Sequence, residues 1–222
     1  MDLEKYQIRS APPTIYYIPD FINEPEENWI LDKVYTAPKP KWTQLLNRRL
    51  QNWGGLPIPN GMIVEPIPSW LKTFMDKVSD LKVFNDGILR ANHVLINEYL
   101  PGQGIMPHVD GPLFYPTIAT ISCSSHTVLE FEKNFAPDEE KADDSKISVF
   151  LQRRSLVIVK DTMYTDYKHT IRELKEDEID ENILNSQLSQ LTLGDKLQRE
   201  TRISLTIRHV PKISKIKLKF GK

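Results

Sequence analysis

The chain has 222 residues, 40% hydrophobic and 27% charged, and its 29 basic and 30 acidic residues give a net charge of −1. This length and composition are typical of one soluble globular domain, and the near-neutral charge excludes a global attraction to nucleic acid or anionic membranes. The single cysteine, Cys123, excludes an internal disulfide and a zinc-thiolate site and favours a reducing compartment.

The amino-terminal residues lack the apolar stretch of a secretory signal, and no run approaches the ~20 apolar residues of a membrane span. We therefore expect a monomeric intracellular protein that does not associate with membranes. Its expected location is the cytoplasm, and also the nucleus if its substrate is nucleic acid.

Residues 1–90 are predicted to form an amino-terminal extension with two helices. The first helix begins after Asn23, which can cap it, and Glu26 completes a capping box three residues later. The second helix begins at Ser69. Apolar side chains recur there at helical spacing, namely Trp70, Leu71, Phe74, Met75, Val78 and Leu81. This stripe indicates a helix face that packs against the core.

From His93 onward the pattern changes to short β-rich runs that are separated by turns or charged segments. The runs lie at 93–100, 117–123, 127–132, 147–152, 155–159 and 202–210. Many short strands are typical of a sandwich or barrel, and a jelly roll fits their number. The predicted fold is therefore α+β and mainly β, with a jelly-roll core at 91–222 inside a single domain that spans 1–222.

Two acidic insertions interrupt the predicted core, at 137–144 and at 173–181. Such charge runs are typical of solvated loops. Residues 182–199, between the second insertion and the last predicted strand, show a weak pattern for one short helix.

Two histidines and an aspartate have the composition of a metal site. His108 and Asp110 stand two residues apart after the run at 93–100, and His169 follows about sixty residues later. Two imidazoles and one carboxylate leave other metal positions open, which is the ligand set of non-haem Fe(II) oxygenases. A zinc hydrolase with the same ligands is an alternative, but it would not need the arginines described next.

Strand alternation gathers polar side chains on one face of the last predicted strand. In residues 202–208 one face carries Arg202, Ser204, Thr206 and Arg208, and the other carries Ile203, Leu205 and Ile207. The same alternation puts Asn97 and Tyr99 on one side of the run at 93–100. Because guanidinium groups pair with carboxylates through two hydrogen bonds, these strands can hold a dicarboxylate. The alternative is an ordinary half-buried strand whose polar face meets water.

Several longer stretches are similar to one known family. They are residues 38–45 (PKPKWTQL), 50–57 (LQNWGGLP), 91–95 (ANHVL), 104–108 (GIMPH) and 202–208 (RISLTIR). Through them the chain resembles the AlkB-homologue family of Fe(II)/2-oxoglutarate dioxygenases, from about Pro13 to its carboxyl end.

The resemblance implies a jelly roll that binds Fe(II) and uses 2-oxoglutarate and O2. It implies that the iron ligands are His108, Asp110 and His169. It also implies that the residues for 2-oxoglutarate are Asn97, Tyr99, Arg202, Ser204 and Arg208, with Arg202 on the distal carboxylate. Ser204 departs from the pattern, because many relatives carry asparagine there.

A substrate edge is predicted in the amino-terminal half, where no acidic residue occurs between Thr36 and Val64. Basic residues beside aromatic rings suit phosphates and stacked bases, and the resemblance implies a lid in this region. The candidate substrate residues are Arg48, Arg49, Asn52 and Trp53.

The expected function is oxidative demethylation of alkylated DNA or RNA, in which hydroxylation of an N-methyl group ends in loss of formaldehyde. One alternative is a protein hydroxylase or demethylase on the same scaffold, because a fold does not fix its substrate. Another alternative is a binding module for nucleic acid or a protein partner, with little turnover.

Overall fold

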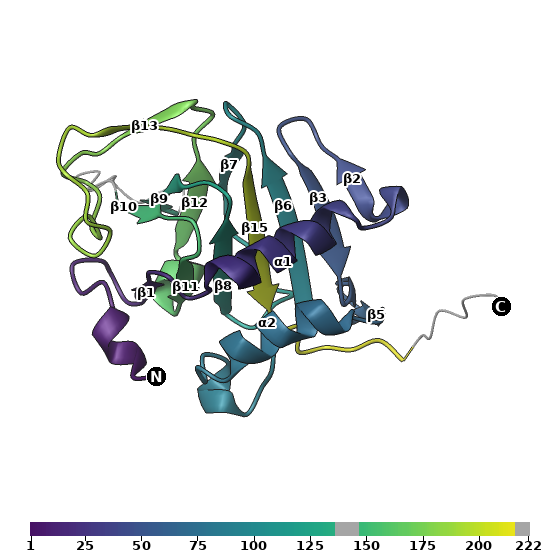
Figure 1. Ribbon diagram of the computed structural model, residues 1–222. Helices are drawn as coiled ribbons and strands as arrows, with labels where there is room; N and C mark the ends of the chain where they lie inside the picture. Colours follow the sequence, from purple (N-terminus) through teal and green to yellow (C-terminus); the bar gives the residue numbers. More distant parts are fainter. Residues whose placement is uncertain (136–146, 216–222) are drawn as a thin grey trace.

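Two antiparallel β-sheets face each other, and two α-helices cover the outer face of the larger sheet (Figure 1). The computed structural model describes residues 1–135 and 147–215. In order, the larger sheet contains β1 (Ile15–Ile18), β11 (Leu156–Lys160), β8 (Thr117–Cys123), β15 (Arg202–Arg208), β6 (His93–Tyr99), β3 (Arg49–Trp53) and β2 (Trp42–Gln44). The smaller sheet contains β10 (Ile147–Leu151), β9 (Thr127–Lys133), β12 (Tyr167–Ile171) and β7 (Ile105–His108).

The remaining elements are short pairs and helices. The two small ladders are β4 (Gly55–Leu56) with β5 (Ile63–Val64), and β13 (Glu176–Glu178) with β14 (Lys196–Gln198). The α-helices are α1 (Glu24–Tyr35), α2 (Ser69–Ser79) and α3 (Thr162–Thr165), and the 3-10 helices are η1 (Leu3–Tyr6), η2 (Lys39–Lys41) and η3 (Asn85–Gly87). None of the helices in the described part of the chain is long and apolar enough to cross a membrane.

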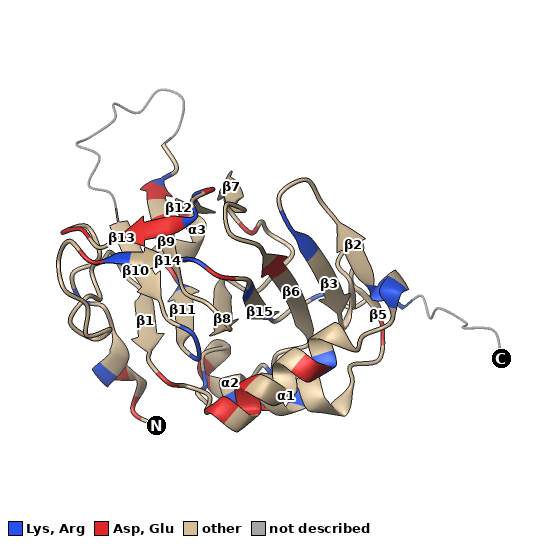
Figure 2. Ribbon diagram, turned by 45° about the horizontal axis from the view of Figure 1, so that its top comes forward, with Lys and Arg blue, Asp and Glu red and all other residues tan. Residues whose placement is uncertain are grey.

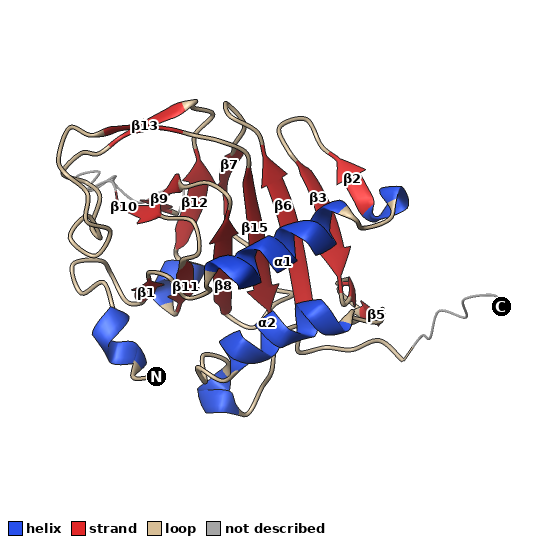
Figure 3. Ribbon diagram, viewed as in Figure 1, coloured by secondary structure: helices blue, strands red, loops and turns tan. Residues whose placement is uncertain are grey.

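Both predicted helices are confirmed, and both lie against the larger sheet (Figure 3). The capping box of α1 forms as expected: the Asn23 side chain accepts from the Glu26 amide at 2.9 Å, and the Glu26 carboxylate accepts from the Asn23 amide at 2.8 Å. Helix α2 begins at Ser69 but ends at Ser79, so Leu81 packs on the core from beyond the helix.

The faces of the larger sheet follow the predicted alternation. On β15, Ile203, Leu205 and Ile207 join the core beneath the helices, whereas Arg202 and Ser204 face the smaller sheet and line the cavity between the sheets. A second apolar core lies between the sheets and includes Leu129, Phe131, Val157 and Val159. The functional side chains therefore stand in the gap of a β-sandwich, as a jelly roll requires.

All six predicted strands form, but the amino-terminal region is not only a helical extension. β1 forms one edge of the larger sheet, and β2 and β3 form the other. β3 pairs directly with the core strand β6, with Leu50 opposite Asn97. These strands have three to five residues, which is too short for periodicity to distinguish them from loops.

The segment from 173 to 199 differs from the prediction. The expected helix within 182–199 is wrong: the residues form turns and then β14, and Ile179 and Ile183 cover Val128 and Phe150 on the outer face of the smaller sheet. The acidic run at 173–181 is solvated only in part: it contains β13, whose Asp177 is buried, whereas its other acidic residues are exposed or half-buried. The insertion predicted at 137–144 lies outside the described residues.

Candidate metal centre and anion pocket

The two histidines and the aspartate of the predicted metal site come together. His108 ends β7, His169 lies opposite it in the β7–β12 register, and their ring centroids are 4.3 Å apart. Asp110 follows two residues after His108. One potential ligand atom from each of the three residues lies within 4.8 Å of the others. The pairing of two antiparallel strands thus brings together ligands that lie about sixty residues apart in the sequence.

Hydrogen bonds and charge prepare these groups to bind a cation. The His108 Nδ1 lies 2.8 Å from the Met106 carbonyl oxygen, which suits an Nδ1–H donor and leaves Nε2 as the ligand atom. Burial lowers the pKa of His169 to about 4, so its imidazole is neutral at pH 7. Burial raises the pKa of Asp110, but Arg208 and the two histidines outweigh it and hold this pKa below its usual value. A neutral imidazole at His169 and an ionised carboxylate at Asp110 result.

Arg208 ties the metal end of the site to the larger sheet. Its Nη2 and Nε donate to the two oxygens of Asp110 at 2.8 and 3.2 Å, and the guanidinium lies over the Phe114 ring. The Asp110 and Arg208 side chains are only 5% and 8% exposed. This fork orients the carboxylate that faces the histidines.

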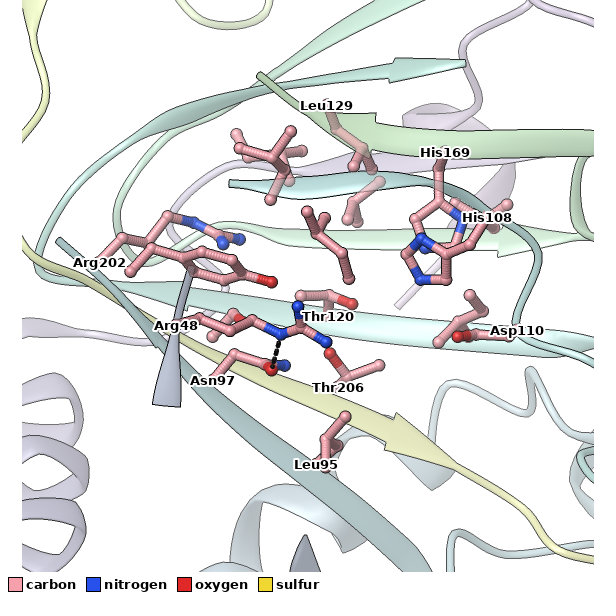
Figure 4. Close-up of a pocket in the computed structure, with 18 of the residues that line it drawn as sticks. Arg48, Leu95, Asn97, His108, Asp110, Thr120, Leu129, His169, Arg202 and Thr206 are labelled. Carbon is pink, nitrogen blue, oxygen red and sulfur yellow. Dashed lines mark hydrogen bonds between the residues drawn. The ribbon is translucent and has the colours of Figure 1, made fainter. Parts of the chain in front are cut away.

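A cavity of about 140 Å³ extends from this cluster along the inner face of the larger sheet. Figure 4 shows His108, His169 and Asp110 at one end of the cavity and Arg202 at the other. Arg202 is 3% exposed, and its Nη2 donates to the Ser122 hydroxyl at 2.7 Å. Its buried Nε has no hydrogen-bond partner, and no carboxylate among the described residues pairs with it. A buried guanidinium without a counter-charge is costly, so this end of the cavity favours an anion.

The other predicted co-substrate residues line the same cavity. Asn97 and Tyr99 face it from β6, and Ser204 lies opposite Asn97 on β15. Burial raises the pKa of the Tyr99 phenol, which therefore remains a hydrogen-bond donor at neutral pH. The two strands thus present an amide, a phenol and a hydroxyl beside the guanidinium of Arg202.

Of the four predicted substrate residues, only Arg48 lines the cavity. Arg49 lies on the opposite face of β3, where it forms a bidentate pair with Glu98 at 2.6 and 2.9 Å. Trp53 packs edge-on against Trp70 of α2. These two side chains face the helices because strand alternation separates them from Arg48.

Asn52 also has partners within the structure. Its side-chain oxygen lies 2.7 Å from Nε2 of buried His93, and its amide donates to the Gly55 carbonyl oxygen. Asn52 therefore contacts His93 at the start of β6. The prediction that it touches substrate stays untested.

Sequence reasoning missed two polar residues of the site, both on β8. Ser122 contacts Arg202, and Thr120 pairs on the cavity side with Thr206, which strand alternation had placed on the polar face of β15. Thr120 and Ser122 share one parity in the run at 117–123, so alternation in that strand was the available signal.

The sequence pattern of the 2OG-Fe(II) oxygenase superfamily matches residues 41–208, a span that includes every cavity residue named above. The chain belongs to this superfamily. The oxygenase is 52% identical over 227 residues to a zebrafish (Danio rerio) protein called probable RNA/DNA demethylase ALKBH6, with 100% of the chain and 96% of the relative covered. It is also 31% identical to an uncharacterized protein of Acanthamoeba polyphaga mimivirus, over 88% of the chain and 84% of that protein.

Solved structures show the same fold at low sequence identity. The structure of OsALKBH1 matches the oxygenase with a TM-score of 0.58 and 15% identity, covering 90% of this chain and 99% of that one. A 2OG-Fe(II) oxygenase from Burkholderia pseudomallei matches with a TM-score of 0.55 and 11% identity, over 98% and 95%. With the relatives above, the comparisons place the oxygenase in the AlkB branch and confirm the predicted jelly roll.

The superfamily implies Fe(II), 2-oxoglutarate and O2, and the residues of the oxygenase fit all three. Imidazole nitrogen and carboxylate oxygen donors in one cluster suit Fe(II) and leave positions for other ligands. The orphaned Nε of Arg202 and its missing counter-charge suit the free carboxylate of a dicarboxylic keto acid. The apolar wall of the cavity, with Leu129 and Val157, suits a small diatomic gas.

Proposed function

We propose that this AlkB-type oxygenase removes methyl groups from alkylated nucleic acid by oxidation. One observation carries the catalytic part of the proposal: a single cavity joins a His-Asp-His cluster at one end to a buried, unpaired guanidinium at the other. The substrate class is supported by the zebrafish relative, whose name is probable RNA/DNA demethylase.

Each end of the cavity has its own role in the proposal. Fe(II) is held by His108, Asp110 and His169, and the distal carboxylate of 2-oxoglutarate pairs with Arg202. The remaining co-substrate contacts are Asn97, Tyr99, Ser204 and Arg208. When bound together, iron, 2-oxoglutarate and O2 supply the oxidation of a C–H bond, and the keto acid ends as succinate and CO2.

The protein itself positions the reactants and excludes water. Arg208 fixes the Asp110 carboxylate, and Ser122 fixes the guanidinium of Arg202. Apolar side chains such as Phe131 and Val159 line the space between them, so the reaction is shielded from solvent. If the oxidised carbon is an N-methyl group, one oxygen atom enters its C–H bond, and the hydroxymethyl product releases formaldehyde and leaves the N–H group.

Basic residues lie near the β2–β3 edge, where a nucleic acid would approach. Figure 2 shows blue segments on the β2–β3 hairpin and on η2. Lys39 is exposed, while Lys41 lies over the Trp53 ring and pairs with Glu65. This local charge, rather than the net charge of −1, would contact phosphates. A paired base must leave its stack to reach the iron, so a single strand is the expected substrate.

The test measures succinate and formaldehyde with candidate substrates under Fe(II), 2-oxoglutarate and O2. We expect both products in equal amounts with N-methylated single-stranded oligonucleotides, and neither with unmethylated oligonucleotides or with His108→Ala. Stimulation by methylated peptides alone would refute the nucleic-acid proposal and favour a protein substrate. Binding of methylated oligonucleotides without any turnover would favour the binding module.

A further inference from the structure

Two adjacent arginines of the β2–β3 hairpin point to opposite sides of the larger sheet. Arg49 pairs with Glu98 on the helix side, whereas Arg48 faces the cavity. Register explains the split, because Leu50 lies opposite Asn97 and Arg49 lies opposite Glu98 on β6. Arg48 therefore reaches the inner face of the sheet, where its guanidinium lies beside Asn97, between Arg202 and the metal cluster (Figure 4).

Arg48 is only partly bonded. Its Nε donates to the Asn97 side-chain oxygen at 3.1 Å, which is the dashed line in Figure 4. The rest of the guanidinium extends into the cavity toward Thr120 and Thr206. No carboxylate among the described residues pairs with Arg48. Arg48 therefore lacks a counter-charge, as Arg202 does, although the two residues belong to different parts of the chain.

The charges that line the cavity leave room for a dianion. Three arginines, Arg48, Arg202 and Arg208, stand against one carboxylate, Asp110, and that carboxylate is already paired with Arg208. Two guanidinium groups therefore lack a counter-charge. Both lie near the Tyr99 phenol: burial raises its pKa, and Arg202 followed by Arg48 opposes the rise.

We propose that Arg48 pairs with the distal carboxylate of 2-oxoglutarate beside Arg202, so that co-substrate binding holds the β2–β3 hairpin over the cavity. The inference rests on the proposed function and adds to it an anchor that comes from outside the jelly-roll core. A carboxylate has two oxygens and about four acceptor sites, so it can accept from both guanidinium groups.

The hairpin contains the contacts to transmit this effect. The turn at its tip closes through the Leu45 amide, which donates to the Arg48 carbonyl oxygen at 2.9 Å. The Asn47 amide donates to the carboxylate of Glu173, in the segment that follows β12. Between them Leu46 is 93% exposed, so the tip has little apolar packing of its own. An added bond from Arg48 to the co-substrate therefore fixes a segment that is otherwise held by a few polar contacts.

The first experiment measures keto-acid affinity anaerobically, from the visible charge-transfer band of the Fe(II) protein and by calorimetry. We expect Arg48→Gln to weaken 2-oxoglutarate binding about tenfold to a hundredfold and to leave the binding of pyruvate, which has no distal carboxylate, unchanged. The matched control, Arg49→Gln, removes the neighbouring charge on the other face and should leave both affinities unchanged. Melting curves establish that each variant is folded.

Hydrogen exchange gives a second readout that does not depend on turnover. In the wild type, 2-oxoglutarate should slow amide exchange in residues 42–53, and pyruvate should not. In Arg48→Gln, saturating 2-oxoglutarate should no longer slow exchange there.

The outcomes separate this inference from the proposed function. If Arg202→Gln weakens 2-oxoglutarate binding but Arg48→Gln does not, the inference is refuted and the proposed function stands. Equal losses for 2-oxoglutarate and pyruvate in Arg48→Gln would refute the assignment to the distal carboxylate. If neither arginine affects binding of the keto acid, the proposed function itself fails.

Discussion

The buried ion pair of the β13–β14 ladder makes a quantitative prediction about stability. Arg199 donates from Nε and Nη2 to the two oxygens of Asp177 at 2.7 and 2.6 Å, and its Nη1 donates to the Arg172 carbonyl oxygen at 2.7 Å. The Arg199 and Asp177 side chains are 5% and 1% exposed. Replacement of Arg199 by methionine keeps a similar volume but leaves the buried carboxylate with only His126 beside it, whose Nε2 lies 3.4 Å from Asp177 Oδ2.

We expect Arg199→Met to lower the free energy of unfolding by about 3–5 kcal/mol, the usual cost of breaking a buried pair from one side. For a chain of this size, that loss lowers the melting temperature by roughly 6–20 °C. Urea unfolding followed by circular dichroism measures the free energy directly. The double variant Asp177→Leu/Arg199→Met should lose less than Arg199→Met alone, because no charge then remains buried.

A control within the same ladder separates burial from charge. Lys196 and Glu178 form a pair at 3.7 Å with side chains 59% and 63% exposed, so Lys196→Met should change stability by less than about 1 kcal/mol. A loss of under 1 kcal/mol for Arg199→Met, or equal losses for both variants, would refute the argument.

The pH dependence of the same pair has a definite sign. Burial raises the pKa of Asp177, but the hydrogen bonds from Arg199, together with nearby His126, outweigh it, so this pKa lies below its usual value. The stabilisation is therefore complete above the unfolded pKa of about 4 and is lost as the pH falls through the lower, folded pKa. The contribution of Asp177 to wild-type stability should therefore be constant from pH 5 to 7 and be lost in that acidic range. In Arg199→Met the effect of burial is no longer opposed by Arg199 and raises the pKa of Asp177, so the stability difference between the two proteins should already shrink as the pH falls through that raised pKa.

Three further predictions concern the site and the core. Arg202→Gln should weaken 2-oxoglutarate binding at least about tenfold in anaerobic titrations, without lowering the melting temperature, because it removes a buried charge whose pKa burial lowers to about 10. Gly104→Ala should lower the free energy of unfolding by roughly 1–3 kcal/mol and weaken Co(II) binding. The added Cβ would lie 2.2 Å from the Ile171 carbonyl oxygen and would push β7 away from β12. An unchanged affinity for Co(II) would contradict this prediction. The Cys123 thiol, fully buried and with its pKa raised by burial, should react with a thiol reagent only after urea unfolding, and rapid labelling of the native protein would disprove it.

The predictable parts of the fold were those whose periodicity extends over enough residues. α2 has eleven residues with a regular apolar stripe, and β15 has seven alternating ones, so both the element and its buried face followed from the sequence. The parity of β15 also placed Arg202 correctly on the inner face. Alternation is a property of the backbone itself and does not depend on tertiary context.

The strands that carry the metal ligands were not predicted, although the ligands were. β7 has four residues including Pro107, and β12 is polar except at its end, so neither resembles a buried strand. Pairing of His169 with His108 depends on neighbours far away in sequence. The 173–199 segment failed for a related reason: its acidic residues suggested solvation, but Arg199 neutralises Asp177 only once the ladder has formed.

The metal site depends on the packing of both sheets. His108 and His169 belong to the smaller sheet, and the loop that carries Asp110 follows β7 of that sheet. The partner of Asp110, however, is Arg208 at the end of β15 in the larger sheet. Separation of the sheets would therefore remove the orientation of one ligand even if the two histidines stayed in register. Metal binding and sandwich closure consequently stabilise each other, because a ligand that binds only the closed form raises the free energy needed to open it.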